Sequence, residues 1–209
     1  MKGKLCRSFI LAGLFTFVAL AGVTRAATLD LSKAAGTPEG LIHAAIEQGL
    51  AVLSDKNLNQ AQRREKIRTI MLEAADMNQM AALSLSKYKS KFTPEQFQQF
   101  TDLFSKLVFN TYIGHVESYN GEPVQYGKTQ KIAADRVRVP LTVMTKDAPV
   151  PGEFSLYKKG TEWKVYDVRI EGISLVNNYR SQFNEFLVNK TPSALIDQLK
   201  HQVSENASK

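Results

Sequence analysis

Side chains that could carry out catalysis are few in this sequence and widely separated. The three histidines, His43, His115 and His201, do not lie at the spacings that create a zinc site. The sequence contains no GxSxG nucleophile elbow, no Walker phosphate loop and no dinucleotide-binding fingerprint. We therefore predict no catalytic residue, no metal site and no cofactor, and interpret each histidine as a surface or structural residue.

Asp167 and Arg169 are two residues apart in a predicted strand, so their side chains are expected on the same face. We interpret them as a structural ion pair, although the same two residues could lie at the mouth of a polar cavity. If the protein is an enzyme instead, Asp167 is the candidate catalytic group. An Asp–His or Tyr–Asp pair inside a pocket would then be expected.

Large apolar side chains are concentrated on one long predicted helix. It begins with a capping box at Thr93–Gln96, which combines an N-cap threonine, a proline at the first helical position and a glutamine at N3. It is expected to end near Ser118. Its broad apolar face could line a cavity, or the helix could be buried on two sides, and the pattern is compatible with both. The residues of that face are Phe97, Phe100, Phe104, Leu107, Val108 and Tyr112.

The stretch 162–170 predicts a central strand, because both of its faces are largely apolar. Trp163 and Val165 are expected on one face, with Tyr166, Val168 and Ile170 on the other. After Gly172 the apolar period changes to that of a helix, expected over 173–188 with Ser174 near its N-cap. We expect the other elements to pack on this corner, where the strand turns directly into the helix.

Three further strands are predicted over 123–132, 136–145 and 152–158. Short connections between them favour sequential antiparallel pairing. In the second strand, alternate valines and leucines form a core face, and arginines form a wet face. Pro140 lies inside that strand and indicates an edge position or a bulge, because proline cannot donate a backbone hydrogen bond.

Helices are predicted on both sides of the strands. Upstream, one helix is predicted to begin at Thr37, a second to include 67–74 and a third to begin at Asp76. Downstream, a last helix is predicted to begin at Thr191. Residues 27–36 are expected to be loose, and 205–209 a disordered tail. Methionines such as Met77 are interpreted as core filler or as the soft wall of a cavity. The predicted fold class is α+β, with a four-stranded curved antiparallel sheet packed against several helices that enclose an apolar pocket.

Residues 1–26 have the pattern of a secretory signal peptide. A basic start precedes the apolar run 9–23, and cleavage is expected after Ala26. The alternative is an uncleaved anchor, but the apolar run is shorter than the roughly 20 residues that span a bilayer. The single cysteine, Cys6, lies in this segment, so the exported chain would contain no thiol. We expect one domain over 27–204 in an exported protein.

The charge of the exported chain is small. Four of the 27 basic residues and none of the 20 acidic residues lie in the predicted signal peptide, which leaves a net charge of +3. No basic stripe with interleaved aromatic residues occurs, so we predict no nucleic-acid partner. A mildly cationic surface is compatible with transient proximity to anionic membranes.

Several stretches of the sequence resemble one known family. They are Trp163–Val168, Glu171–Val176, Tyr179–Phe183, Thr93–Gln96 ahead of the long helix, and Tyr119–Glu122 after it. In these stretches the chain is similar to the MlaC-like toluene-tolerance family of periplasmic lipid-binding proteins. The resemblance covers roughly 37–199. Family members often carry a Leu-Gly pair where this chain has Leu-Ser-Leu-Ser at 83–86.

The resemblance implies a soluble carrier of phospholipid, or of a hopanoid-type lipid. It would shuttle lipid between an inner-membrane ABC transporter complex and an outer-membrane lipoprotein complex. A protein that only bridges envelope complexes is the alternative, and a small-pocket enzyme is a further one. The residues expected to contact lipid are Phe100, Phe104, Leu107, Val108, Tyr112, Val139, Leu141, Val143, Phe154, Leu156, Trp163, Val165, Val168, Ile173 and Val176.

Overall fold

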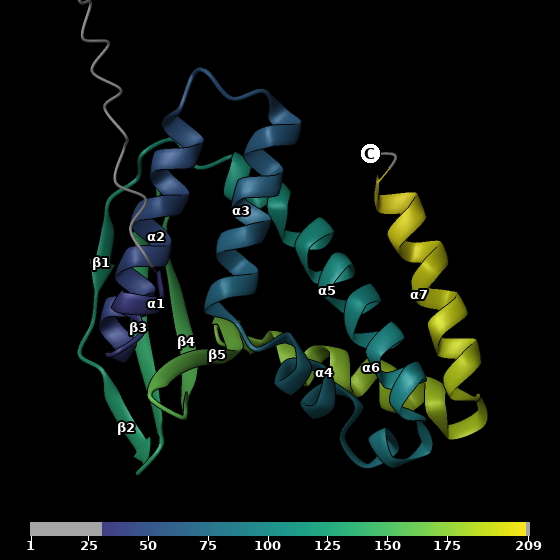
Figure 1. Cartoon of the computed structure of the whole chain (residues 1–209). Coiled ribbons are helices and arrows are strands. Elements are labelled where there is room, and N and C mark those ends of the chain that lie inside the picture. Colours follow the sequence, from purple (N-terminus) through teal and green to yellow (C-terminus); the bar gives the residue numbers. More distant parts are fainter. Residues whose placement is uncertain (1–30, 208–209) are drawn as a thin grey trace, which may run out of the picture.

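The computed structural model describes residues 31–207, and the predicted signal peptide lies outside them. A sheet with two helices on it forms one side of the molecule, and a group of helices forms the other (Figure 1). The elements are α1 (Leu31–Ala34), α2 (Pro38–Ser54), α3 (Gln60–Ala74), α4 (Met77–Leu85), the 3₁₀ helix η1 (Ser86–Lys91), α5 (Pro94–Glu117), β1 (Val124–Tyr126), β2 (Gln130–Ala133), β3 (Arg136–Met144), β4 (Pro149–Lys159), β5 (Glu162–Ile170), β6 (Ile173–Ser174), α6 (Leu175–Asn189) and α7 (Pro192–Ala207).

The sheet is antiparallel, as predicted, but in the described residues it has six strands instead of four. Its order is β1-β3-β4-β5-β6, with β2 also paired to β3. The predicted first strand is divided into β1 and β2 near Gly127, whose N–H donates to the carbonyl of Pro140 at 2.9 Å. Pro140 has no N–H to return that bond, so the ladder with β3 is interrupted there.

A β-bulge in β5 reverses the predicted alternation of its side chains. Ser155 pairs with Asp167 while the next residue, Leu156, pairs with Val165, so Tyr166 is the extra residue. As a result Val168 belongs to the same apolar cluster as Trp163 and Val165. The prediction that Val168 and Trp163 lie on opposite faces was wrong, because alternation with period two assumes an unbroken ladder.

The connection from β5 to α6 is a tight hairpin and not the direct strand-to-helix corner that was predicted. Glu171 and Gly172 both have positive φ angles, 50° and 81°, as a two-residue turn with right-handed strand twist requires. The short strand β6 then pairs Ile173 with Ile170. Ser174 is the N-cap of α6 and accepts from the Asn177 N–H, which confirms the predicted cap.

The first apolar cluster lies between the sheet and helices α1 and α2 (Figure 1). Leu31 and Ala35 are 3% and 1% exposed, and the carbonyl of Ala35 accepts from the Trp163 N–H at 2.9 Å. The prediction of a loose segment over 27–36 was therefore wrong for residues 31–36. The strand residues of this sheet cluster are Val137, Val139, Leu141, Val143, Phe154, Leu156, Trp163, Val165 and Val168, with Val124 at its margin.

The second apolar cluster is formed by α4, η1, α5, α6 and α7, and none of its members comes from a strand. Phe100, Phe104, Tyr179 and Phe183 form its centre, with ring centroids 5.2–5.9 Å apart. Met77 is buried in this helical cluster. The long helix α5 packs along α7 (Figure 1). The prediction that every element packs on the β5–α6 corner was wrong, because α5 has a helical partner for its aromatic face.

Local capping signals are confirmed at the helix starts. Thr37 and Thr93 are N-caps, the second in the predicted capping box with Gln96, and Asn59 forms a further box with Gln62. At the other end, α7 continues to Ala207, past the position where a disordered tail was predicted. Across residues 31–207, no helix has both the length and the apolar character required to cross a bilayer.

Ser86, at the junction of α4 and η1, has a backbone conformation that favours glycine. Its φ and ψ angles are 51° and −126°, and such a conformation costs a non-glycine residue about 1–3 kcal/mol. We expect Ser86→Gly to raise the free energy of unfolding by about 1 kcal/mol, since the flexibility of glycine in the unfolded chain offsets part of the relief.

Thermal denaturation tests this, with an expected rise in Tm of about 2–4 °C. Ser90→Gly in η1 is the matched control and should lower stability, because no positive φ is relieved there. An unchanged or lower Tm for Ser86→Gly would contradict the assignment of strain.

Candidate functional site

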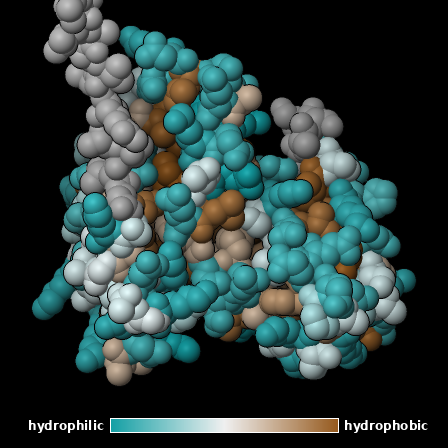
Figure 2. Space-filling model, viewed as in Figure 1, coloured by the Kyte–Doolittle hydropathy of each residue, from teal (hydrophilic) through white to brown (hydrophobic). Residues whose placement is uncertain are grey.

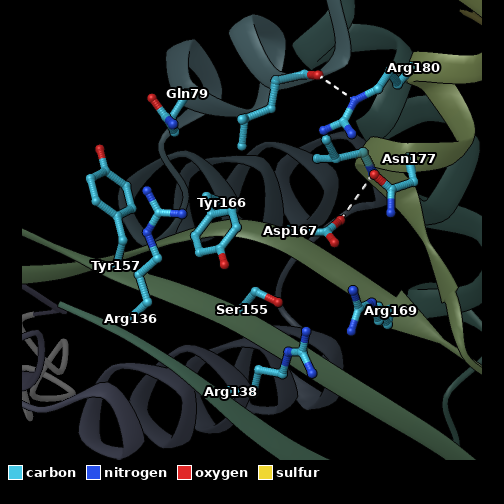
Figure 3. Close-up of a pocket in the computed structure, with 12 residues that line it drawn as sticks. Gln79, Arg136, Arg138, Ser155, Tyr157, Tyr166, Asp167, Arg169, Asn177 and Arg180 are labelled. Atoms are coloured by element: carbon cyan, nitrogen blue, oxygen red, sulfur yellow. Dashed lines mark hydrogen bonds between the residues drawn. The ribbon is translucent and has the colours of Figure 1, made fainter. Parts of the chain in front are cut away.

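A cavity of about 230 Å³ lies between helices α4 and α6 and the face of the sheet that points away from α1 and α2 (Figure 3). The sheet contributes mostly polar side chains, whereas the helices contribute both polar and apolar ones. An apolar pocket was predicted between sheet and helices, so the polar floor is a difference. The cavity is lined by Gln79, Leu83, Arg136, Arg138, Ser155, Tyr157, Tyr166, Asp167, Arg169, Val176, Asn177 and Arg180.

The strand pattern explains why the floor of the cavity is polar. On β3, valines that face the sheet cluster alternate with Arg136 and Arg138, which therefore point into the cavity. On β5, the bulge places Asp167 and Arg169 on this same face. Ser155 lies between the two strands and is 2% exposed (Figure 3).

Glu153 joins two of the arginines across the sheet. Its Oε1 lies 3.0 Å from Nη1 of Arg169 and 3.3 Å from Nε of Arg138. The expected pair between Asp167 and Arg169 is therefore replaced by a Glu153–Arg169 pair. Asp167 and Arg169 share a strand face, as predicted, but their bonded partners come from different elements.

Asp167 is buried and is used to hold helix α6 against β5. Its carboxylate accepts from the Ser174 hydroxyl at 2.7 Å. It also accepts from the Val176 N–H at 3.0 Å, the bond drawn as a dashed line from Asp167 in Figure 3. A carboxylate at the N-terminus of a helix is stabilised by the unpaired N–H groups and the helix dipole. The geometry thus assigns Asp167 to positioning the helix that closes one side of the cavity.

The other two arginines have no carboxylate partner among residues 31–207. The guanidinium of Arg136 lies over the ring of Tyr166, 5.8 Å from its centroid. Nε of Arg180 donates to the carbonyl of Leu83 at 2.9 Å and so links α6 to α4. These contacts orient both side chains but leave their positive charges without a counter-charge.

Asp76 joins the start of α4 to the sheet. One carboxylate oxygen accepts from the Tyr157 hydroxyl and from Nζ of Lys159, both at 2.6 Å, and the other accepts from the Gln79 N–H at 2.9 Å. Burial would raise the pKa of Asp76, but the bonds from Lys159, Tyr157 and the Gln79 N–H outweigh it and lower the pKa.

The Tyr157–Asp76 pair is the Tyr–Asp arrangement that an enzyme would require, yet its atoms are committed to structure. Burial, followed by the bond to Asp76, raises the pKa of Tyr157, so this phenol stays protonated and donates at neutral pH. No group of three metal-ligating side chains comes together in the described part of the chain. No histidine lines the cavity.

We expect Asp76→Asn to lower the free energy of unfolding by about 2 kcal/mol at neutral pH. The asparagine retains the N-cap but removes the ion pair with Lys159. Because the folded pKa of Asp76 lies below its ordinary value of 3.8, its contribution is complete above that value. It is lost as the pH falls through the folded pKa.

The difference in stability between wild type and Asp76→Asn should therefore shrink only in strong acid. Urea unfolding at pH 7, 5 and 3 measures it. Asp197→Asn, which removes an exposed ion pair with Lys200, is the control and should change stability by less than about 0.5 kcal/mol. A pH-independent difference would refute the role of the Asp76 charge.

Of the fifteen residues predicted to contact lipid, fourteen are divided between the two clusters. Val176 is the one that lines the cavity. Ile173 lies at the tip of the β5–β6 hairpin and is 68% exposed. Phe100, Phe104, Leu107, Val108, Tyr112 and Val176 belong to or pack against the helical cluster, and Val139, Leu141, Val143, Phe154, Leu156, Trp163, Val165 and Val168 belong to or pack against the sheet cluster.

The cavity arginines were not among the predicted site residues. Arg136 and Arg138 are visible in the sequence as the wet face of the second predicted strand, and Arg180 as a polar position on the following helix. Alternation could have placed the first two together on one face. Only the packing of α4 and α6 shows that this face is partly covered, and that Arg180 meets it.

Known proteins resemble this chain in sequence and in fold. Residues 43–201 match the family model described as MlaC protein. A toluene tolerance protein, ttg2D, from Pseudomonas putida is 31% identical over 98 residues, which is 46% of this chain and 46% of that protein. The aligned stretch thus spans about half the length of this curated relative.

A solved structure shares most of the fold. It is that of a phospholipid-binding protein from Ralstonia solanacearum in complex with a phospholipid, with a TM-score of 0.73 and 25% sequence identity. The match covers 85% of this chain and 99% of that chain. Since the family model spans more than half of the sequence and the fold agrees, the chain belongs to the MlaC protein family.

Proposed function

We propose that this protein is a periplasmic lipid carrier. It would enclose the acyl chains of a phospholipid, or of a hopanoid-type lipid, and carry them between an inner-membrane ABC transporter complex and an outer-membrane lipoprotein complex. The observation that carries this proposal is the likeness to a phospholipid-binding protein solved with its lipid, over 99% of that chain. Membership of the MlaC family supports it.

The energetics of an acyl chain explain why a carrier is needed. At about 0.8 kcal/mol per methylene, exposing a chain of some sixteen carbons to water costs on the order of 12 kcal/mol. A lipid therefore does not cross an aqueous compartment unaided at a useful rate. Inside a bilayer the acyl chain is already shielded from water, so a pocket that holds it with about the same free energy as the membrane is sufficient. A partner protein that binds the loaded and empty carrier with different affinities can then shift the equilibrium from loading to unloading.

Loading requires the cavity to widen. Its volume of about 230 Å³ lies below the range of about 300–1,000 Å³ that is typical of ligand pockets. Its helical wall includes Val176, a member of the helical cluster, and Leu83, which packs against that cluster. Movement of α4 and α6 away from the sheet would uncover apolar surface for the chains, while Asp76 and Asp167 keep the two helix starts attached.

The small volume favours one alternative, a protein that only bridges envelope complexes. Native mass spectrometry of the full chain purified from cells distinguishes the two functions. A carrier should retain an adduct of phospholipid mass that denaturation releases, and the emptied protein should take up labelled lipid from vesicles. Protein that carries no lipid and takes none up would refute the carrier and support bridging.

A further inference from the structure

The four arginines of the cavity exceed its carboxylates. Arg136, Arg138, Arg169 and Arg180 line it, and Asp167 and Glu153 are the acids on or beside its floor. Both acids are engaged: Glu153 is shared by two arginines, and Asp167 faces the N-terminus of α6. The cavity therefore has an excess of two positive charges. Arg136 is exposed to solvent, whereas Arg180 is partly buried, where solvent screens charge less than at the surface.

A second observation points to a ligand with oxygen acceptors. Ser155 lines the cavity floor (Figure 3), where a bound group could accept a hydrogen bond from its hydroxyl. The hydroxyl of Ser155 and the guanidinium of Arg136 come from adjacent strands and both point into the cavity, where one bound group can reach both.

We propose that this cavity binds a phosphate group, and that Arg136 and Arg180 are its principal ligands. The planar guanidinium donates two parallel hydrogen bonds to neighbouring phosphate oxygens, a geometry that ammonium groups do not match. Arg138 and Arg169 already form ion pairs with Glu153, and they add to the positive electrostatic potential of the cavity. This proposal rests on the proposed function: the phosphate is that of the carried lipid, whose headgroup is therefore bound by the protein.

The proposal divides the lipid between two parts of the molecule. The phosphate lies on the polar floor formed by β3, β4 and β5, and the acyl chains extend past Leu83 and Val176 as α4 and α6 move away. The remainder of the headgroup faces solvent and is not selected. The carrier should thus accept several phospholipids but discriminate against a neutral lipid with the same chains.

Labelled dioleoyl lipids test this directly. Uptake from vesicles by the full chain is compared for dioleoyl phosphatidylglycerol, dioleoyl phosphatidylcholine and dioleoylglycerol. Both phospholipids should be taken up at least about tenfold better than dioleoylglycerol, the difference that charge-assisted hydrogen bonds provide. In the double variant Arg136→Gln/Arg180→Gln, the ratio of phospholipid uptake to dioleoylglycerol uptake should fall to about one.

A second double variant controls for net charge. Lys106→Gln/Lys131→Gln removes two exposed positive charges from α5 and β2, outside the cavity, and should keep the phospholipid advantage. Circular dichroism and Tm show whether each variant is folded. If Arg136→Gln/Arg180→Gln unfolds, Arg136→Gln alone replaces it and should lose at least half of the advantage.

Inorganic phosphate separates a lipid headgroup from a free anion as the source of the phosphate. If it binds in calorimetry to wild type but not to Arg136→Gln/Arg180→Gln, and no lipid is taken up, the phosphate site stands and the carrier function fails. Equal uptake of phospholipid and dioleoylglycerol overturns the phosphate site and leaves the carrier function intact. Binding of neither lipid nor phosphate overturns both.

Discussion

Phe104→Ala is expected to lower the free energy of unfolding by about 4 kcal/mol. Phe104 is fully buried at the centre of the helical cluster, and its ring centroid lies 5.2 Å from that of Tyr179, 5.8 Å from Phe100 and 5.9 Å from Phe183. Truncation removes the burial of the ring and leaves a cavity among aromatic groups that cannot close around it. Urea denaturation followed by far-UV circular dichroism measures the loss.

Val116→Ala on the same helix is the control. Val116 is 37% exposed, so its truncation should cost less than about 1 kcal/mol. A loss of under about 1 kcal/mol for Phe104→Ala as well would show that the four rings do not form a packed core. The aromatic face of α5 would then be free to line a cavity.

Leu83→Trp is expected to reduce lipid uptake about tenfold or more. Leu83 stands on the helical wall of the cavity, and the larger indole would occupy the place where α4 must move away from the sheet. Overpacking of this kind costs about 1–3 kcal/mol, which a folded domain of this size tolerates. Uptake of labelled phospholipid from vesicles and the Tm are measured on the same samples.

Two further variants locate the effect. Asn177→Trp obstructs the cavity from an exposed position on α6, and it too should reduce uptake, with little effect on Tm. Val188→Trp lies on α6 outside the cavity and is 62% exposed in wild type, so it should leave uptake unchanged. Normal uptake by folded Leu83→Trp and Asn177→Trp would place the lipid elsewhere.

Elements with local signals were predicted well. The capping box at Thr93 and Gln96, the N-cap at Ser174 and the last three predicted strands all depend on residues that are neighbours in the chain. A hydroxyl that accepts from an N–H three residues later has the same partner in nearly any tertiary context. The family was also predictable, because the stretches of this chain that resemble the family include these locally determined elements.

The site was less predictable, because its residues meet only through tertiary packing. The arginines of β3 appeared as the wet face of a strand, and the sequence does not show that α4 and α6 cover that face. Likewise, the apolar faces of α5 and of the sheet were expected to share one pocket, yet each has its own partner. An apolar face requires cover, but its pattern does not specify which element provides it.

The sequence by itself determined the α+β class, the helix starts and the family, since each follows from composition or from contacts within a few residues. Only the tertiary structure decided the bulge at Tyr166, the division of the first strand at Gly127 and the polar cavity. The bulge depends on the register between β4 and β5, and the divided strand on the approach of Gly127 to Pro140. Such contacts join residues distant in the chain, so no local pattern encodes them.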